Sequence, residues 1–282
     1  MHPTKNWNCA AFAALVTVTA LPCGAQRYPE RPIRIVVPYA PGGATDLAVR
    51  FVADKMSAAL GQQIVVDNRP GAGSMLGTEL VAKSAPDGYT LLQTNATVSM
   101  PTLFPDVPFD MVKDLKPLSM LGYSNLVLTV HPSLPVRSVK ELIALAKRRP
   151  GEMNYATAGS GSFIHLAMEY LISLSGMKLV HVPYKGGAPG AIATMTGETQ
   201  ITFGGIGSSL PHIKQGRLRA LAVSGTKRHF SLPDVPSVDE AGVKGFAAPS
   251  WYGLFAPSRT PEAIMVKLAT EARSALADSG VR

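Results

Sequence analysis

Short apolar runs rich in β-branched residues alternate along the chain with segments whose apolar residues recur every three or four positions. The runs predict buried strands, and the recurring pattern predicts amphipathic helices. In the first half, strands are predicted at 33–37, 64–66 and 89–93, and helices at 45–60 and 75–83. Gly61 follows the first helix, as is typical of a C-terminal cap. This order predicts a parallel sheet covered by helices.

The alternation resumes after a less regular stretch at about 100–122. Strands are predicted at 126–130, 153–156, 179–184, 201–203, 218–223 and 251–256. Helices are predicted at 138–149, 163–174 and 261–277, with a short helix ending near 195 and another before 218. Ser138, with Glu141 three residues later, is typical of an N-terminal cap. We therefore expect an α/β fold of two lobes, each a mostly parallel sheet flanked by helices. The first lobe would comprise 26–122 and 249–282 and the second 123–248, joined near 120–126 and 246–252.

The N-terminal segment has the pattern of an export signal. Lys5 is its single charged residue, an apolar run follows at 10–21, and small residues lead to Ala25. This pattern predicts a signal peptide at 1–25, cleaved near Ala25, and a periplasmic protein. The alternative is a membrane anchor, with or without a lipid on Cys23, but the run is short for a membrane span. Both cysteines, Cys9 and Cys23, lie in this segment, so disulfides and thiolate chemistry are excluded from the mature protein.

Composition and charge narrow the class of protein. The chain is 46% hydrophobic and 16% charged, which is too apolar for a disordered protein and too polar for a polytopic membrane protein. The formal net charge is +8, but the densest basic run is only Lys147, Arg148 and Arg149. A nucleic-acid-binding protein would carry a basic stripe, so we expect no nucleic-acid partner.

Two Gly-rich turns, at 36–46 and 153–162, share one organisation: a strand, a glycine loop and the start of a helix. Ligands of α/β proteins bind beyond the carboxyl ends of the strands, and free N–H groups at a helix N-terminus attract anions. Two such turns on two lobes would face each other across a cleft and suit an anionic ligand. The alternative is that the glycines only permit tight turns.

Enzymatic chemistry is the main competing hypothesis. No nucleotide-binding motif is present, and Gly159–Phe163 lacks the last glycine of a nucleophile elbow. A periplasmic hydrolase or isomerase would use Ser160 or Ser162 with His165, although His165 is better explained as a brace for the loop. No histidine spacing indicates a metal site, and no cofactor is expected. Asp46 fits a helix cap, and Lys185 fits equally well a ligand clamp or a solvated side chain.

Several motifs together resemble a known family. They are 28–38, 40–46, 67–74, 85–92, 159–166 and 181–186, and the similarity spans essentially all of 26–282. The chain resembles the periplasmic substrate-binding receptors of tripartite tricarboxylate transporters, the Bug-type proteins. The resemblance implies a two-lobed Venus-flytrap fold, no catalysis, and a monomer that delivers a small carboxylate to a permease of one large and one small membrane subunit.

The expected ligand contacts lie in the glycine loops, at strand ends and in the motif at 181–186. In the family pattern, 40–46 and 158–162 are carboxylate loops, and Thr94 and Asn95 end a strand that faces the cleft. The expected contacts are Tyr39, Ala40, Pro41, Gly42, Gly43, Ala44, Thr45, Asp46, Ser74, Thr94, Asn95, Ala158, Gly159, Ser160, Gly161, Ser162, Tyr184 and Lys185.

The chain departs from the family pattern at two places. Gln200 stands where an aspartate is common, which argues against an amino-acid ligand because its ammonium group would need an acidic partner. The sequence also stops at Arg282, whereas family members continue with a helix that returns to the first lobe. A truncated chain and a naturally short chain both remain open.

Overall fold

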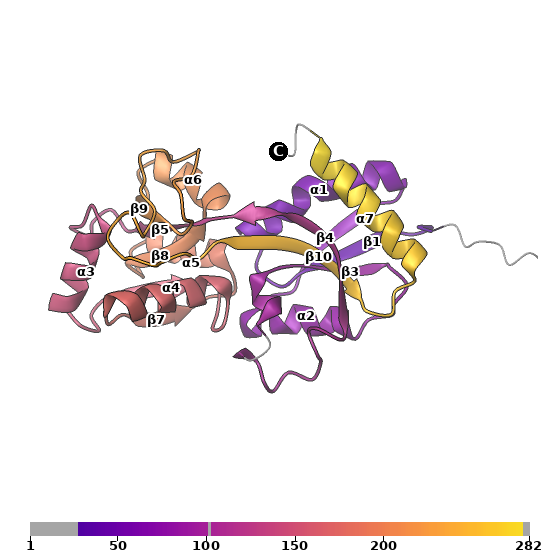
Figure 1. The fold of residues 1–282 in the computed structure, drawn as a ribbon, viewed down its shortest axis with the longest axis horizontal. Coiled ribbons are helices and arrows are strands. Elements are labelled where there is room, and N and C mark those ends of the chain that lie inside the picture. Colours follow the sequence, from indigo (N-terminus) through magenta and orange to yellow (C-terminus); the bar gives the residue numbers. More distant parts are fainter. Residues whose placement is uncertain (1–27, 101–102, 279–282) are drawn as a thin grey trace, which may run out of the picture.

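The computed structural model describes residues 28–100 and 103–278. The predicted signal peptide at 1–25, with Cys9, Cys23 and the cleavage position after Ala25, lies outside the described residues. The described chain forms two lobes side by side, joined by long strands (Figure 1). Each lobe is a sheet with helices on both faces, as the alternating hydrophobic pattern predicted.

The first lobe is built on a sheet with the order β2-β1-β3-β10-β4. Its strands are β1 (Ile33–Val37), β2 (Ile64–Asn68), β3 (Thr90–Asn95), β4 (Leu115–Ser124) and β10 (Ser250–Pro257). β1 pairs in parallel with β2 and β3, whereas β10 runs antiparallel to β3 and β4. Four strands therefore share one direction, and the strand that arrives from the second lobe opposes them.

The second lobe repeats this plan with the order β7-β6-β8-β5-β9. Its strands are β5 (Leu126–Val130), β6 (Asn154–Thr157), β7 (Val180–Pro183), β8 (Ile201–Gly205) and β9 (Arg219–Val223). β5, which arrives from the first lobe, is again the antiparallel strand, paired with β8 and β9. Each sheet is thus mixed, with its single reversed strand supplied by the connection between the lobes.

The stretch at 100–122, expected to be irregular, contains most of β4. Pro117 and Gly122 interrupt the alternating pattern that would have identified a strand. Pro117 is tolerated because β4 is the edge strand of its sheet, where a missing N–H group breaks no internal ladder, and Gly122 lies at a register shift opposite Tyr252. After Asn125 the chain enters β5, so the first connection is a nearly continuous extended segment.

Helices cover both faces of each sheet. They are α1 (Ala44–Leu60), α2 (Met75–Ala82), α3 (Val139–Arg148), α4 (Phe163–Ser175), α5 (Gly187–Met195), α6 (Ile206–Lys214) and α7 (Glu262–Ala277), with 3₁₀ turns η1 (Ala72–Ser74) and η2 (Ala96–Ser99). The cap residues Gly61 and Ser138 are confirmed: Gly61 is left-handed, and the Ser138 hydroxyl accepts from the Glu141 N–H. None of the helices in the described ranges is both long and apolar enough to cross a membrane.

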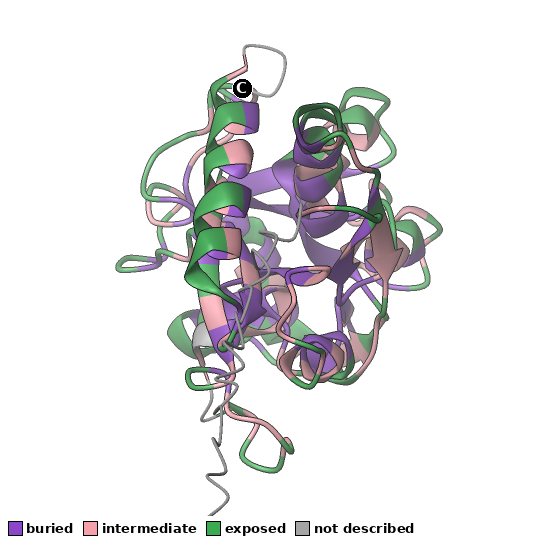
Figure 2. Ribbon diagram, turned by 90° about the vertical axis from the view of Figure 1, so that its right-hand side faces the viewer, coloured by how far each residue is buried: buried purple, intermediate pink, exposed green. Residues whose placement is uncertain are grey.

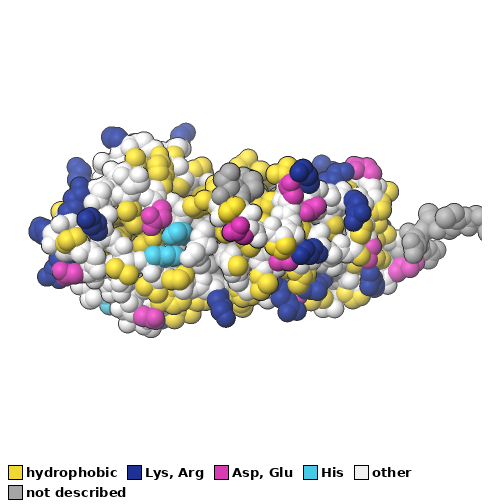
Figure 3. Space-filling model, turned by 90° about the horizontal axis from the view of Figure 1, so that it is seen from below, with side chains coloured by type: hydrophobic (Ala, Val, Ile, Leu, Met, Phe, Trp, Pro, Cys, Tyr) yellow, Lys and Arg dark blue, Asp and Glu magenta, His cyan; other side chains and the backbone are white. Residues whose placement is uncertain are grey.

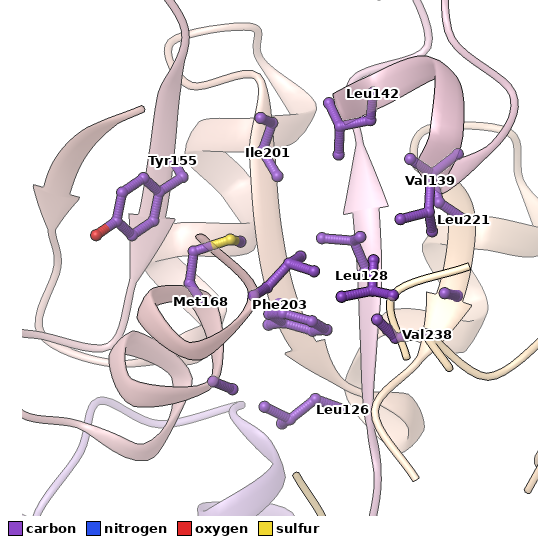
Figure 4. Packing of buried hydrophobic residues seen from close by; sticks show 14 of the residues in the cluster. Leu126, Leu128, Val139, Leu142, Tyr155, Met168, Ile201, Phe203, Leu221 and Val238 are labelled. Carbon is purple, nitrogen blue, oxygen red and sulfur yellow. The ribbon is translucent and has the colours of Figure 1, made fainter. Parts of the chain in front are cut away.

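Each lobe has its own hydrophobic core. In the first lobe, α1 and α7 pack on one face of the sheet and α2 on the other. Figure 2 shows α7 with its outer side exposed and its inner side buried. In the second lobe, Leu128, Phe203 and Met168 centre a cluster between the sheet and helices α3 and α4 (Figure 4).

Candidate functional site

A small cavity lies where the two lobes meet, at the carboxyl ends of β1, β3, β6 and β8. It is lined by Tyr39, Gly43, Ala44, Thr45, Asn95, Leu126, Ala158, Ser162, Phe163, Ile164, Gly187, Gly205, Ser208, Ser250 and Tyr252. None of these lining residues carries a formal charge. These residues come from both lobes. The lobes are therefore closed on each other in this structure.

Four helix N-termini converge on this cavity. Gly43 precedes α1, Ser162 precedes α4, Gly186 precedes α5 and Gly205 precedes α6. The N-termini of α1 and α4 belong to the two predicted glycine loops. Those of α5 and α6 have the same arrangement as that of α1, in which a glycine directly precedes the helix. Aligned peptide dipoles make each N-terminus partly positive, so the cavity is electropositive without a lysine or arginine in its lining.

Backbone donors remain available at two of these helices. Within the described residues, no hydrogen bond uses the N–H groups of Ala44 and Thr45 in α1 or of Phe163 and Ile164 in α4. All four residues line the cavity. Unused donors at a helix N-terminus need an acceptor, and a carboxylate oxygen is a strong one.

Asp46 fixes the shape of the first glycine loop. Its carboxylate is buried and accepts from the Gly42 N–H at 3.0 Å, Arg50 Nε at 2.9 Å and Asn68 Nδ2 at 3.0 Å. Burial alone would raise the pKa of Asp46, but the hydrogen bonds from Arg50, Gly42 and Asn68 outweigh it and lower that pKa. Asp46 is thus a cap that holds the loop, as its place in the first helical turn predicted, and it does not line the cavity.

Replacing Asp46 with alanine is expected to lower the free energy of unfolding by about 2–3 kcal/mol at neutral pH, because the Gly42 N–H loses its charged acceptor. A carboxylate whose pKa is lowered in the folded state stabilises the protein at pH values above its unfolded-state pKa, which is about 4. This stabilisation is lost as the pH falls below about 4 and through the folded-state pKa. Urea unfolding at several pH values tests this. Asp54→Ala, an exposed change in the same helix, is the control and should stay within about 0.5 kcal/mol of the unmodified protein. A pH-independent deficit in Asp46→Ala would contradict the assignment.

The second glycine loop does not form a serine–histidine pair. The Ser162 hydroxyl accepts from the backbone N–H of His165 and serves as the N-cap of α4. The His165 ring instead accepts, at Nδ1, from the Gly161 N–H. Ser160 is exposed and does not line the cavity. The hydrolase hypothesis required a hydroxyl bonded to a basic ring nitrogen, and His165 braces the loop.

The two lobes touch through backbone and small side chains. The Ala40 N–H in the first lobe donates to the Lys185 carbonyl in the second, at 2.8 Å. A Cβ atom added at Gly205 would lie 2.3 Å from the Ala44 Cβ, and one added at Gly73 would lie 2.1 Å from the Ser160 carbonyl oxygen. Glycine is therefore needed at these positions for the lobes to approach this closely.

The structure brings only part of the predicted set together. Seven of the expected contacts line the cavity, namely Tyr39, Gly43, Ala44, Thr45, Asn95, Ala158 and Ser162. The others lie outside the lining, namely Ala40, Pro41, Gly42, Asp46, Ser74, Thr94, Gly159, Ser160, Gly161, Tyr184 and Lys185. Burial raises the pKa of Tyr39 above its usual range. A tyrosine hydroxyl is protonated at neutral pH even at its ordinary pKa, so it can donate to a ligand.

Two of the residues outside the lining have other partners. The Tyr184 hydroxyl donates to Glu198, and the Lys185 side chain is exposed while its carbonyl makes the contact between the lobes. Several residues of loops 40–46 and 158–162 do not line the cavity. They set the conformation of the loop backbone that lines it.

Sequence reasoning missed several lining residues. Gly187, Gly205 and Ser208 belong to the N-termini of α5 and α6, and Ser250 and Tyr252 to the returning strand β10. The signal for Gly205 was present, because Gly204 and Gly205 end a buried strand and directly precede a helix, much as in the two glycine loops. The contribution of β10 has no local signature.

Gln200 does not bear on the ligand in the expected way. It lies just before β8, where its Oε1 accepts from the Asn154 N–H at 2.8 Å. The cavity lies beyond the opposite end of that strand, at Gly205. The substitution of an aspartate here therefore says nothing about a ligand ammonium group. The absence of an acidic residue among the lining residues is the better argument against an amino-acid ligand.

The described residues also contain no cluster of three or more histidine, cysteine, aspartate or glutamate side chains that could hold a metal ion. The lining consists of backbone groups, hydroxyls, one amide and apolar side chains. This arrangement suits recognition of an anion by hydrogen bonds.

Known proteins share both the sequence and the fold. The profile of the tripartite tricarboxylate transporter family receptor matches residues 48–282. BugT of Bordetella pertussis (strain Tohama I) is 38% identical over 265 residues, which are 93% of this chain and 81% of BugT. The solved structure of the periplasmic binding protein BugD is 34% identical with a TM-score of 0.87, covering 90% of this chain and 85% of BugD.

A second solved structure contains a ligand. MatC from Rhodopseudomonas palustris, with bound malate, is 33% identical with a TM-score of 0.87, covering 90% of this chain and 87% of MatC. The similarity thus extends over both lobes and the cleft between them. This chain belongs to the receptor family of the tripartite tricarboxylate transporters and has the two-lobed fold of its solute-binding proteins.

Proposed function

We propose that this chain captures a small di- or tricarboxylate between its lobes, with one carboxylate held by the N-termini of α1 and α4. The observation that carries the proposal is the convergence of four helix N-termini on an uncharged cavity. Each hydrogen bond from a backbone N–H to a charged acceptor contributes about 1.5–3 kcal/mol. Each helix terminus adds about 0.3–1 kcal/mol, and more when partly buried.

The malate bound to MatC supports the class of ligand. Malate has two carboxylates, which matches a site with helix N-termini on both lobes. The lobes close over the cavity, so they must separate for such a molecule to enter. The lobes would move relative to each other about Asn125 and the residues before Ser250, where the two connecting segments pass from one lobe to the other. The first lobe would then comprise 26–122 and 249–282, and the second 123–248.

A receptor of this kind acts outside the cytoplasm and hands its ligand to a membrane permease. The periplasmic relative BugD supports a periplasmic location, and the predicted signal peptide, cleaved near Ala25, supplies the route. The family match supports a permease of the tripartite type as the partner. The protein would act as a monomer, without a cofactor, and would release its ligand unchanged.

Thermal unfolding with a panel of mono-, di- and tricarboxylates tests the proposal. A true ligand at one hundred times its Kd should add about 2.7 kcal/mol of stability. Mass spectrometry of the recovered ligand tests the absence of catalysis. Chemical conversion would support an enzyme, and no stabilisation by any carboxylate would contradict the proposed ligand class.

Lys185→Ala is expected to change the Kd by less than about fivefold, because an exposed ammonium group contributes about 0–1 kcal/mol. The Lys185 side chain is exposed, and the contact that this residue makes between the lobes uses its carbonyl, which alanine retains. Calorimetry with the ligand found in the panel gives the Kd. A loss of a hundredfold or more would show that charge pairing by this lysine, rather than helix N-termini, holds the ligand.

A further inference from the structure

A cluster of titratable side chains lies beside the second glycine loop and is not used by the proposed binding site. His165 in α4 stacks on His181 in β7 with ring centroids 4.1 Å apart, and His181 stacks on Tyr155 in β6 at 5.1 Å. Histidine side chains lie beside an acidic one on the lower face of the molecule (Figure 3). The Tyr155 hydroxyl is turned away from the hydrophobic cluster (Figure 4) and donates to Glu169.

Each histidine is connected to a glycine of the loop. The Gly161 N–H donates to His165 Nδ1 at 3.2 Å. The Gly159 N–H donates to Thr157 Oγ1 at 3.2 Å, and this hydroxyl lies 2.7 Å from His181 Nε2. The backbone between Ala158 and Ser162, two residues that line the cavity, is therefore held by imidazole groups.

The bond to Gly161 requires a particular protonation state. An Nδ1 atom that accepts carries no proton, so His165 is the neutral tautomer with its proton on Nε2. Protonation would place a hydrogen on Nδ1 that points at the Gly161 N–H. Two donors would then face each other, and the loop would have to move.

The surroundings of His165 decide when this happens. Glu169, on the same helix, has Oε1 3.8 Å from His165 Nε2, while His181 faces the ring from β7 and Tyr155 from β6. Burial lowers the pKa of His165, and the nearby Glu169 offsets this only in part. Burial and the neighbouring His165 also lower the pKa of His181. The loop is therefore held at neutral pH, and its brace is lost as pH falls below about 6.5.

We infer that His165 is a positioning residue, which keeps the second glycine loop in its ligand-binding conformation only while its imidazole is neutral. The effect on ligand capture rests on the proposed function, because it assumes that this loop binds a carboxylate. The coupling between His165 and Gly161 does not, and it can be measured in the protein without ligand.

The first experiment follows the ¹⁵N–¹H signal of Gly161 and the ring signals of His165 by NMR, without ligand, from about pH 8 to about pH 5. We expect both to titrate with one midpoint below about 6.5. His165→Asn places an amide oxygen near the position of Nδ1 and cannot titrate, so Gly161 should show no such midpoint. His131→Asn, at a histidine bonded to Ser133, is the control and should titrate like the unmodified protein. A Gly161 signal that is unchanged while His165 titrates would overturn the inference.

The second experiment measures malate binding at about pH 7.5 and about pH 5.5. Malate itself takes up protons in this pH range, but this affects the unmodified protein and the His165 variants equally. We expect the unmodified protein to lose about tenfold more affinity than His165→Asn on acidification, and His165→Leu, which offers no acceptor, to bind about tenfold more weakly at both pH values. Equal losses in the unmodified protein and His165→Asn would overturn the pH effect. If malate binds none of these proteins, malate is not the ligand, and the Gly161 titration still decides the role of His165.

Discussion

Gly43→Val is expected to weaken ligand binding by a hundredfold or more while the protein stays folded. The Gly43 backbone has φ −77° and ψ 167°, which valine adopts without strain. A Cβ at this position would contact the backbone nitrogens of Ala188 at 3.8 Å and Gly187 at 3.9 Å, so the branched side chain would fill the space between the N-termini of α1 and α5. A hundredfold loss corresponds to about 2.7 kcal/mol, the strength of one or two hydrogen bonds to a carboxylate.

Gly43→Ala is the matched control at the same position. Its single methyl group meets its neighbours at ordinary van der Waals distances. It should therefore retain binding within about fivefold. Calorimetry gives the Kd of each variant, and circular dichroism with thermal unfolding shows whether each is folded. Normal binding by a folded Gly43→Val protein would mean that the ligand does not use the N-terminus of α1.

Gly205→Ala is expected to weaken binding by tenfold or more through a different mechanism. The added Cβ would lie 2.3 Å from the Ala44 Cβ on the opposite lobe, so the lobes could not reach the observed closed arrangement. The backbone of Gly205, with φ −64° and ψ 137°, accepts alanine without strain, so the second lobe itself should not be disturbed. Gly205→Ala therefore tests the closure of the two lobes without disturbing the fold of either.

Gly207→Ala, two residues further along in α6, is the control because a Cβ there meets nothing within 4 Å. Small-angle scattering with saturating ligand should show contraction in the Gly207→Ala protein and a smaller contraction in Gly205→Ala. Equal affinity and equal contraction of the two variants would mean that the ligand-bound lobes stay further apart than in the closed structure.

The hydrophobic pattern determined the elements and their order. Apolar runs predicted β1 and β5, and helical spacing predicted α1 and α4, to within one residue or so of their observed bounds, because the strands are buried almost throughout and each helix buries one face. The same pattern failed at β4, since an edge strand with Pro117 and Gly122 is exposed along one side and needs no strict alternation. Local sequence also identified the caps Gly61 and Ser138, whose hydrogen bonds lie within a few residues.

The sequence alone also located two of the four helix N-termini of the cavity, because a strand, a glycine loop and a helix start are contiguous in the chain. Only the tertiary structure showed that Gly187, Gly205 and Tyr252 meet them, since these residues come from other helix N-termini of the second lobe and from the returning strand β10. It also identified the loop N–H groups that Asp46 and His165, expected as a cap and a brace, accept from, and it showed that the Lys185 side chain is exposed. Residue types define what chemistry a side chain can perform, but which partners it reaches depends on how the two sheets close on each other.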